Sequence, residues 1–326
     1  MMKTLPILTF DAQFKSVIWG GKRIADFKAI PSQGDNIGES WELSGVAGHE
    51  SVVADGEFKG RNLQELINDH SEELMGGNVC RRFGHTFPLL IKLIDSADDL
   101  SVQVHPDDAL AARRHSCPGK TEMWVSIDPA DGAYLYSGLK DKLTPESYRN
   151  AIADNTIIDY LGKYFPRRGD VFFLPAGRIH SIGRGNFVLE IQETSDITYR
   201  IYDYDRRDAA GKPRQLHVEE SIEAVNFDDT ADAAPTQIPT EKNTEHVIAD
   251  CEHFTTTVLD LDDNFTLDLS ERDSFTIVTV IAGNAVITAP DGAETELKKG
   301  YTALIPASME RADINGPCTI VSAYIR

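Results

Sequence analysis

The feature of this sequence that most restricts its fold is a succession of short apolar runs separated by turn-forming residues. Val, Ile, Phe and Thr dominate the runs, and Gly, Pro and Asp stand between them. The runs read PLLIKLI, LSVQVHP, EMWVSI, GDVFFLPAG and NFVLEIQE in the first part of the chain and HFTTTVLDL, NFTLDLS, SFTIVTVIAG, NAVITAPDG, TALIPA and CTIVSAYI in the last part. Short strands joined by tight turns are typical of antiparallel barrels and sandwiches. The pattern therefore predicts a mainly β protein.

Two stretches depart from this pattern and predict helices inserted between the strands. Residues 61–76 (RNLQELINDHSEELMG) carry apolar side chains at helical spacing. Residues 144–164 begin with Thr144 and Pro145, residue types that favour the cap and first turn of a helix. We expect a few such helices around a β framework.

A change of composition predicts a division of the chain into two domains. Residues 226–246 are acidic, contain proline and have few large apolar side chains, as a linker or loosely packed crossing segment does. Strand-like runs resume after it. We therefore predict one β domain in residues 1–235, with the helical insertions, and a second in residues 236–326.

Composition also excludes several classes of partner. With 32 Lys and Arg against 52 Asp and Glu, the 326-residue chain has a formal net charge of -20, so its field repels nucleic acid and anionic membranes. The N-terminal apolar run is interrupted by Pro6, which makes it too short for a signal peptide, and no apolar stretch approaches the roughly 20 residues that span a bilayer. Four cysteines without a CxxC pair favour reduced thiols. We predict a cytoplasmic protein without nucleic-acid or membrane partners.

The stretch GDVFFLPAGRIH carries the most informative local pattern. Gly169 leads into an apolar strand, and Pro175 and Gly177 form a tight turn. His180 then begins the next strand and points into the predicted barrel. The spacing, G-x5-P-x-G-x2-H, resembles the second signature of the cupin superfamily, and this resemblance implies a cupin-like β-barrel or jelly roll.

A second copy of the pattern lies near the end of the sequence. Gly300, Pro306 and Ala307 in GYTALIPASMER repeat the offsets of the first copy, but Arg311 stands where the first copy has His180. The halves therefore read as two β units from one template, of which only the first keeps a ligand-type side chain. We expect two cupin-like domains, the first catalytic and the second without metal ligands.

Upstream of His180, two further strands carry ligand-type side chains. The alternation in LSVQVHPDD puts Gln103 and His105 on one strand face, and that in KTEMWVSI puts Lys120 and Glu122 on one face. Buried charges of this kind need partners. Two imidazoles, one carboxylate and one amide oxygen suit a divalent metal ion that keeps positions open for water or substrate. The alternative is a polar core in which these groups satisfy one another.

Several longer segments, in the same order along the chain, resemble the type I mannose-6-phosphate isomerases. They are IGESWELS, LIKLIDSADDLSVQVHPDD, KTEMW, FLPAGRIHSIG and SDITYRIYDYDR. The resemblance extends from about Trp19 to Arg207 and is to the compact bacterial branch of the family. One departure is Thr121, where many members carry proline between the lysine and the glutamate.

The resemblance implies an isomerase that interconverts mannose 6-phosphate and fructose 6-phosphate with one zinc ion (Zn2+) per chain. It also implies roles for particular residues. The implied zinc ligands are Gln103, His105, Glu122 and His180. The implied catalytic arginine is Arg200, and Lys92, Lys120, Glu190 and Asp196 match further active-site positions of the family.

The chemistry of the residues agrees with this implication. Interconverting an aldose and a ketose moves one proton between adjacent carbons, and a Lewis acid stabilises the enediolate formed on the way. Lys92, Lys120 and Arg200 could form the basic pocket that a phosphate needs in so acidic a protein. Either Glu190 or Asp196 could move the proton, with Asp196 slightly favoured through its family counterpart.

Two other functions remain open from the residues alone. Two histidines and a carboxylate also suit Fe(II), which gives a cupin-type oxygenase as one alternative. A non-catalytic sugar-binding cupin is the other, because the second domain has lost its histidine. The remaining histidines lack ligand-like spacing and receive no role: His49, His70, His85, His217, His246 and His253. The chain is expected to be a monomer or a homodimer.

Overall fold

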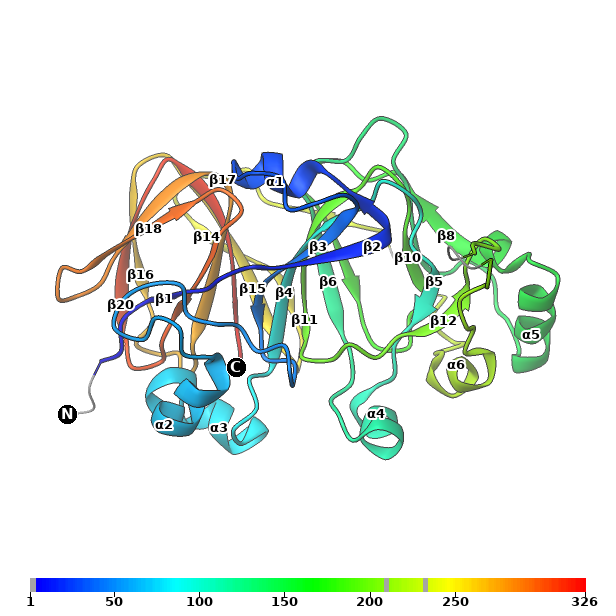
Figure 1. The fold of residues 1–326 in the computed structure, drawn as a ribbon, viewed down its shortest axis with the longest axis horizontal. Helices are drawn as coiled ribbons and strands as arrows, with labels where there is room; N and C mark the ends of the chain where they lie inside the picture. Colours follow the sequence, from blue (N-terminus) through cyan, green and yellow to red (C-terminus); the bar gives the residue numbers. More distant parts are fainter. Residues whose placement is uncertain (1–3, 208–210, 231–233) are drawn as a thin grey trace.

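The computed structural model describes residues 4–207, 211–230 and 234–326. Its described residues form three antiparallel sheets, with the helices at the periphery (Figure 1). The prediction of a mainly β fold is confirmed. None of the helices in these ranges has the length and apolar character needed to cross a lipid bilayer.

Two of the sheets form the first β unit, which is the first barrel. Over the described residues, the larger has seven strands in the order β13-β9-β6-β11-β4-β3-β2 and the smaller has five in the order β12-β5-β10-β7-β8. The larger sheet consists of β2 (Gln13–Gly21), β3 (Ile37–Ser44), β4 (Leu89–Asp95), β6 (Glu122–Ser126), β9 (Asp170–Leu174), β11 (Phe187–Glu193) and β13 (Thr236–Gln237). The smaller consists of β5 (Val102–Val104), β7 (Leu135–Leu139), β8 (Leu161–Tyr164), β10 (His180–Ile182) and β12 (Tyr199–Tyr202).

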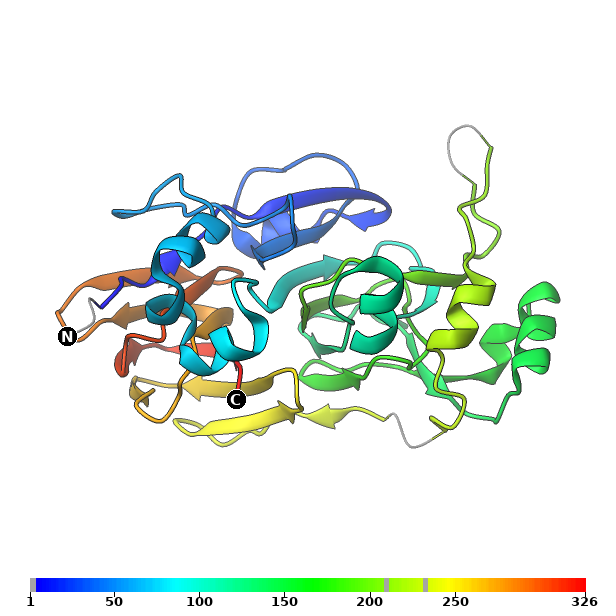
Figure 2. The same cartoon turned by 90° about the horizontal axis from the view of Figure 1, so that it is seen from below.

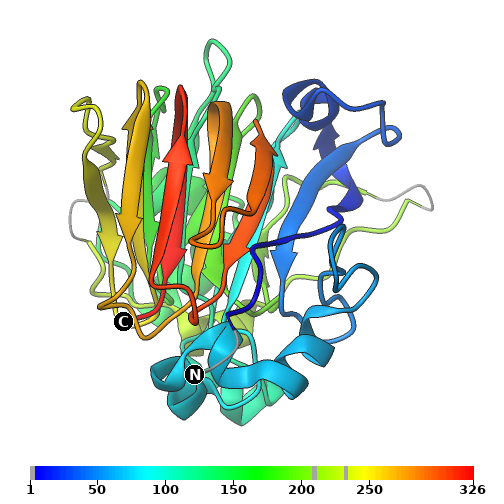
Figure 3. The same ribbon diagram turned by 90° about the vertical axis from the view of Figure 1, so that its left-hand side faces the viewer.

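The third sheet forms the second β unit, which lies beside the first along the long axis of the molecule (Figures 1 and 2). It is viewed from its own side in Figure 3. The strands are β1 (Leu8–Thr9), β14 (Glu245–Asp250), β15 (Thr255–Leu261), β16 (Asn264–Asp268), β17 (Thr276–Thr288), β18 (Glu294–Lys298), β19 (Thr302–Ile305), β20 (Arg311–Asn315) and β21 (Cys318–Tyr324). Because β1 pairs with β19, the start of the described chain belongs to the second unit.

The prediction of a turn between SFTIVTVIAG and NAVITAPDG is wrong. The two runs form the single strand β17, whose first half pairs with β19 and β21 and whose second half pairs with β18 and β20. A register shift between Val280 and Ala282 bends the strand, and Gly283 follows it with φ +69°. Gly283 therefore lies at a bend inside the strand, where a residue without Cβ can adopt a positive φ with little strain.

The helices confirm one prediction and correct another. The expected helix in residues 61–76 is α2 (Leu63–Met75), capped by Asn62. The helix expected in residues 144–164 stops early: α5 spans Pro145–Ala153, and Asn155 then takes a left-handed conformation (φ +58°). A 3-10 turn (Ile157–Tyr160) and β8 follow, because this part of the chain pairs with β7. The other helices are α1 (Arg23–Lys28), α3 (Gly77–Phe83), α4 (Asp108–His115) and α6 (Val218–Ala224).

One hydrophobic core joins the two β units. Leu89, Ile91 and Leu93 point from β4 away from the first barrel and share a buried cluster with Ile277 and Val321 of the second unit. The opposite face of β4 lines the first barrel. Both faces are thus covered, which explains why PLLIKLI is almost continuously apolar rather than alternating. Burying one such Leu or Ile contributes about 1.5–3 kcal/mol.

Within its described residues, the predicted linker contains one short strand that pairs with the first unit. Residues 226–230 follow α6, and β13 pairs with β9 of the first barrel. Residues 231–233 of that stretch, like residues 1–3 of the N-terminal run, lie outside the described residues. The division of the chain at residue 235 stays a prediction.

Candidate active site

The two candidate histidines are brought together by the five-stranded sheet. His180 opens β10, and its backbone is paired with Gln103 on β5. His105 follows β5 directly, so alternation points it to the same side as Gln103. Pro106 then ends the strand, as its missing N–H requires. Both histidines are buried, with about 1% of the surface of each exposed.

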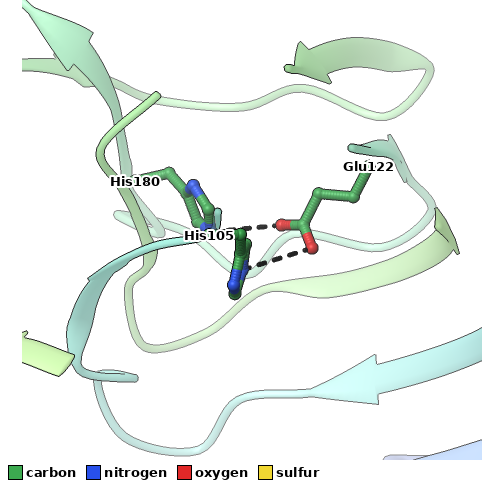
Figure 4. A group of neighbouring side chains, drawn as sticks. All are labelled: His105, Glu122 and His180. Atoms are coloured by element: carbon green, nitrogen blue, oxygen red, sulfur yellow. Dashed lines mark ion pairs between the residues drawn. The ribbon is translucent and has the colours of Figure 1, made fainter. Parts of the chain in front are cut away.

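The carboxylate comes from the opposite sheet. Glu122 opens β6, where its backbone is paired with Leu174 and Gln192 of the neighbouring strands. It is fully buried, with a relative exposure of 0%. Figure 4 shows its carboxylate turned toward both imidazoles, so the three side chains join the two sheets across the interior of the barrel.

The distances in this cluster fit a shared cation. Glu122 Oε1 lies 3.1 Å from His180 Nε2, and Glu122 Oε2 lies 3.6 Å from His105 Nε2 (Figure 4). The candidate ligand atoms all lie within 4.8 Å of one another. The amide of Gln103 is beside them, with its Nε2 3.3 Å from Nε2 of His180.

Backbone carbonyls orient both imidazoles. His105 Nδ1 lies 2.8 Å from the carbonyl oxygen of Ile197, and His180 Nδ1 lies 2.9 Å from that of Arg178. Since a carbonyl only accepts, each Nδ1–H donates and each Nε2 is directed at Glu122. An Nδ1–H held in this way is the usual support of a histidine that binds metal through Nε2.

Charge states in the cluster also suit a metal ion. Burial, followed by the nearby ammonium of Lys120, holds the pKa of His105 well below its ordinary value, so this imidazole is neutral. Burial would raise the pKa of Glu122, but Lys120 and both histidines hold it well below its ordinary value. Lys120 Nζ lies 2.8 Å from Glu122 Oε2 and 3.1 Å from His105 Nε2.

The Glu122 carboxylate lacks conventional hydrogen bonds. Among the described residues, neither of its buried oxygens accepts a hydrogen bond of normal geometry, although the Lys120 ion pair approaches Oε2. Lys120 balances the charge of this carboxylate at Oε2, but Oε1 faces Nε2 of His180, and a buried oxygen without a hydrogen bond is costly. A cation bound by Glu122, His105 and His180 would remove that cost, so the donor set fits zinc better than it fits a self-satisfied polar core.

Lys92 and Glu190 lie farther along the same sheet and pair with each other. They face each other across β4 and β11, with Lys92 Nζ 3.0 Å from Glu190 Oε1. Trp124 Nε1 donates to Glu190 Oε2 at 2.9 Å, and its ring packs edge-on against His180. Burial alone would lower the pKa of Lys92, but Glu190 raises it above its ordinary value. The lysine is therefore a buried cation held by a carboxylate.

Arg200 lies on the strand that flanks Gln103 opposite His180, and several charged residues lie near the Arg200 guanidinium. Its strand β12 pairs with β5, which puts Arg200 opposite Gln103. Arg206 and Arg214 both bind the carboxylate of Asp203, each at 2.5 Å. Burial, followed by the charge of Arg214, lowers the pKa of Arg200, and its buried Nε has no hydrogen-bond partner among the described residues. Three guanidinium groups thus lie near Asp203, and Arg206 also lies 3.9 Å from a carboxylate oxygen of Asp98.

Asp196 is the predicted site residue that lies farthest toward solvent. It is exposed, in the loop between β11 and β12, and forms no ion pair with any residue in the described ranges. The next residue, Ile197, supplies the carbonyl that orients His105. Asp196 therefore borders the metal cluster without contacting it.

Comparison with known proteins identifies the family. The family model described as "Phosphomannose isomerase type I, catalytic domain" matches residues 7–129, and "Mannose-6-phosphate isomerase, cupin domain" matches residues 242–325. The mannose-6-phosphate isomerase of Streptococcus mutans is 34% identical over 97% of this chain and 98% of its own length. This chain belongs to the type I phosphomannose isomerase family. Its resemblance to that family, predicted from the motifs, is confirmed.

Further type I phosphomannose isomerases agree in sequence and fold. Mannose-6-phosphate isomerase ManA of Bacillus subtilis is 34% identical over 99% of this chain and all of its own length. The crystal structure of a Bacillus subtilis mannose 6-phosphate isomerase superposes with a TM-score of 0.87 at 32% identity, covering 98% of this chain and 100% of that one. A phosphomannose isomerase family member is an enzyme, so the oxygenase and the non-catalytic cupin are set aside.

Several neighbours of the site were not singled out from the sequence. Arg206 and Asp203 fall within the family-like segment SDITYRIYDYDR, which was a usable signal, but Arg214 has no local pattern around it. The carbonyls of Arg178 and Ile197 carry no side-chain signal at all. In the second unit, Arg311 opens β20 as His180 opens β10, but it is exposed and pairs with Asp313.

Proposed function

We propose that this chain interconverts mannose 6-phosphate and fructose 6-phosphate at the site between the two sheets of the first barrel. The observation that carries the proposal is the Glu122 carboxylate, buried without normal hydrogen bonds, between two imidazoles oriented by backbone carbonyls. Membership of the type I phosphomannose isomerase family supports the same substrates.

Zinc is the metal that this donor set favours. His105, Glu122 and His180 would hold one zinc ion per chain, with Gln103 beside them, because two imidazoles and a carboxylate leave positions open as catalytic zinc sites do. Bound there, the ion would supply the Lewis acidity that polarises the carbonyl and hydroxyl oxygens of the sugar. No redox step is needed for the isomerisation.

The phosphate binds on the Arg200 side of the site. Lys92 and Lys120 are already paired with Glu190 and Glu122, so their charges are largely compensated. Among the described residues, Arg200, Arg206 and Arg214 lie near Asp203, and Arg206 also lies 3.9 Å from Asp98, so three guanidinium groups stand against two carboxylates. An excess of guanidinium charge with a free Arg200 Nε suits a phosphate, which arginine binds through two parallel hydrogen bonds.

The proton transfer is assigned to residues that border the metal ligands. Glu190 is engaged through both oxygens by Lys92 and Trp124, so its function is to hold Lys92 in place. Asp196 is exposed and has no ion-pair partner among the described residues. We assign it the role of general base, which takes the proton from one substrate carbon and returns it to the adjacent carbon. The Lys120 ammonium has three N–H donors, of which Glu122 and His105 take two, so the third donates to a substrate oxygen as negative charge develops on it.

A coupled assay for fructose 6-phosphate formation tests the proposal. Purified protein should convert mannose 6-phosphate, lose activity when a chelator removes its metal, and recover it when zinc is added. Metal analysis should give one equivalent of zinc per active chain. Protein that holds a full equivalent of zinc and still produces no fructose 6-phosphate would refute the proposed reaction.

A further inference from the structure

A second cluster of ligand-type side chains lies next to the candidate metal site. It consists of Asp108, Glu193 and His253, whose ligand atoms also lie within 4.8 Å of one another. Unlike Glu122, these carboxylates are satisfied by the protein itself. Glu193 accepts a hydrogen bond from the backbone N–H of Thr121 at 2.6 Å, and Asp108 accepts one from Gly119 at 2.7 Å. The cluster therefore has no need of a metal ion.

Glu193 connects this second cluster to the segment that carries Glu122. Its Oε2 binds the N–H of Thr121, and its own backbone N–H donates to the carbonyl of Thr121 at 3.1 Å. Thr121 is thus held at both its backbone polar groups by a single residue. Since Thr121 stands between Lys120 and Glu122, its position sets where both of these side chains enter the barrel. Proline at position 121 would lack the N–H on which the first bond depends.

Thr121 also contacts the turn that leads to His180. Its side-chain Oγ1 accepts a hydrogen bond from the backbone N–H of Ala176 at 3.3 Å. Ala176 belongs to the PAG turn between β9 and β10, and β10 begins with His180. One buried threonine therefore ties the Glu122 segment to the His180 segment.

His253 extends these contacts to the second β unit. It lies in the loop between β14 and β15, and its Nδ1 is 2.9 Å from Glu193 Oε1. Glu193 is 6% exposed and His253 17%, so the pair is largely shielded from water. Asp108 and Glu252 add negative charge around the imidazole, at 3.9 and 3.4 Å. The second unit thus contacts a residue that holds the ligand segment of the first.

We propose that His253 and Glu193 are positioning residues for the metal site, through which the second β unit holds Lys120 and Glu122 in place. The inference rests on the metal site proposed above. Outer partners of metal ligands typically change metal affinity or activity by about 10–100-fold when they are removed. For His253, which acts through Glu193 and Thr121, we expect the lower end of that range.

The test compares His253→Leu with His253→Asn. The amide Nδ2 of asparagine can donate to Glu193 from nearly the same place as histidine Nδ1, whereas leucine fills the space and donates nothing. His246→Leu is the matched control, since His246 also lies near a carboxylate of the second unit, with Nε2 3.7 Å from Glu241, but not near Thr121. Zinc affinity is measured by competition with a chromophoric chelator, and kcat and KM are measured at saturating zinc.

We expect His253→Leu to bind zinc about 10-fold more weakly and to lower kcat more than it raises KM. His253→Asn should restore most of the zinc affinity and most of kcat. The control, His246→Leu, should match the unmodified protein in both. Equal zinc affinity in the leucine and asparagine variants would overturn the inference, as would a second equivalent of zinc that is lost on replacing His253. If His253→Leu does not fold, the same comparison is made at Glu193, the residue that His253 contacts. Glu193→Gln then takes the place of the asparagine variant, and Glu193→Ala that of the leucine variant.

The outcomes separate this inference from the proposed function. If the unmodified protein binds no zinc, or binds it without isomerising the sugar phosphate, the proposed function fails. If it binds zinc and isomerises the substrate, and the His253 variants behave like it, only the role of His253 and Glu193 fails.

Discussion

Glu122 and His180 belong to opposite sheets of the first barrel, yet Oε1 of the one lies 3.1 Å from Nε2 of the other. The contact closes the interior between β6 and β10. A cation bound there would tie the two sheets together, so metal binding should stabilise the fold as well as support the reaction.

Glu122→Gln should bind zinc at least about 100-fold more weakly, because a ligand matters more than the outer partners that cost 10–100-fold. The neutral amide also removes the negative charge that attracts the ion. Zinc titration with a competing chelator measures the effect. Glu296→Gln, at an exposed position on β18 of the second unit, serves as the control. Unchanged zinc binding in Glu122→Gln would remove this residue from the ligand set.

Arg200→Ala should lower turnover by at least about 100-fold while leaving the zinc content unchanged, because Arg200 lies beside the ligands but does not contact the candidate cation site. Steady-state kinetics and metal analysis on the same preparation test both parts. Arg149→Ala, which breaks an exposed ion pair with Glu219, is the control for loss of a guanidinium. Near-normal turnover would exclude Arg200 from the mechanism.

The pair of His253 and Glu193 predicts a specific dependence of stability on pH. Burial would lower the pKa of His253, but Glu193, with Asp108 and Glu252, raises it above its ordinary value of 6.5. The folded protein therefore holds this proton more tightly than the unfolded chain. The stabilisation is complete below the unfolded pKa and is lost as the pH rises through the folded one.

Urea denaturation of the unmodified protein and of His253→Asn, both saturated with zinc, measures this dependence. The advantage of the unmodified protein should be larger at about pH 6 than at about pH 9, because only the histidine carries a charge that can be lost. An advantage that is the same at both values would show that the charge of His253 contributes nothing.

Lys28→Met should destabilise the fold by about 3–5 kcal/mol, because it leaves Glu42 buried without its counter-ion. Both residues are about 97% buried, and Lys28 Nζ lies 2.5 Å from Glu42 and donates to the carbonyl of Gly300 at 2.7 Å. The contact joins α1 and β3 to the second unit. Equilibrium denaturation should show a smaller loss for the double variant with Glu42→Leu. A Lys28→Met variant as stable as the unmodified protein contradicts the prediction.

Most of the framework could be predicted because period-two alternation and turn residues are local signals. Gln103 and His105 are two residues apart in one strand-like run, so alternation alone puts them on the same face. Helix α2 follows from its Asn62 cap and from the helical spacing of its apolar residues. The failures have non-local causes. β17 runs through an expected turn because partners on both sides continue the ladder, and α5 stops at Ala153 because the following residues pair with β7.

The sequence by itself determined the fold class, the family resemblance and which side chains are of ligand type, since these depend on residue identity and short-range periodicity. Only the tertiary structure decided which of them meet. Lys92 and Lys120 are compensated by Glu190 and Glu122, and Arg200 gains Arg206 and Arg214 as neighbours, because strand pairing brings these residues together. The same holds for His253, whose contact with Glu193 exists only because the two β units pack against a shared core.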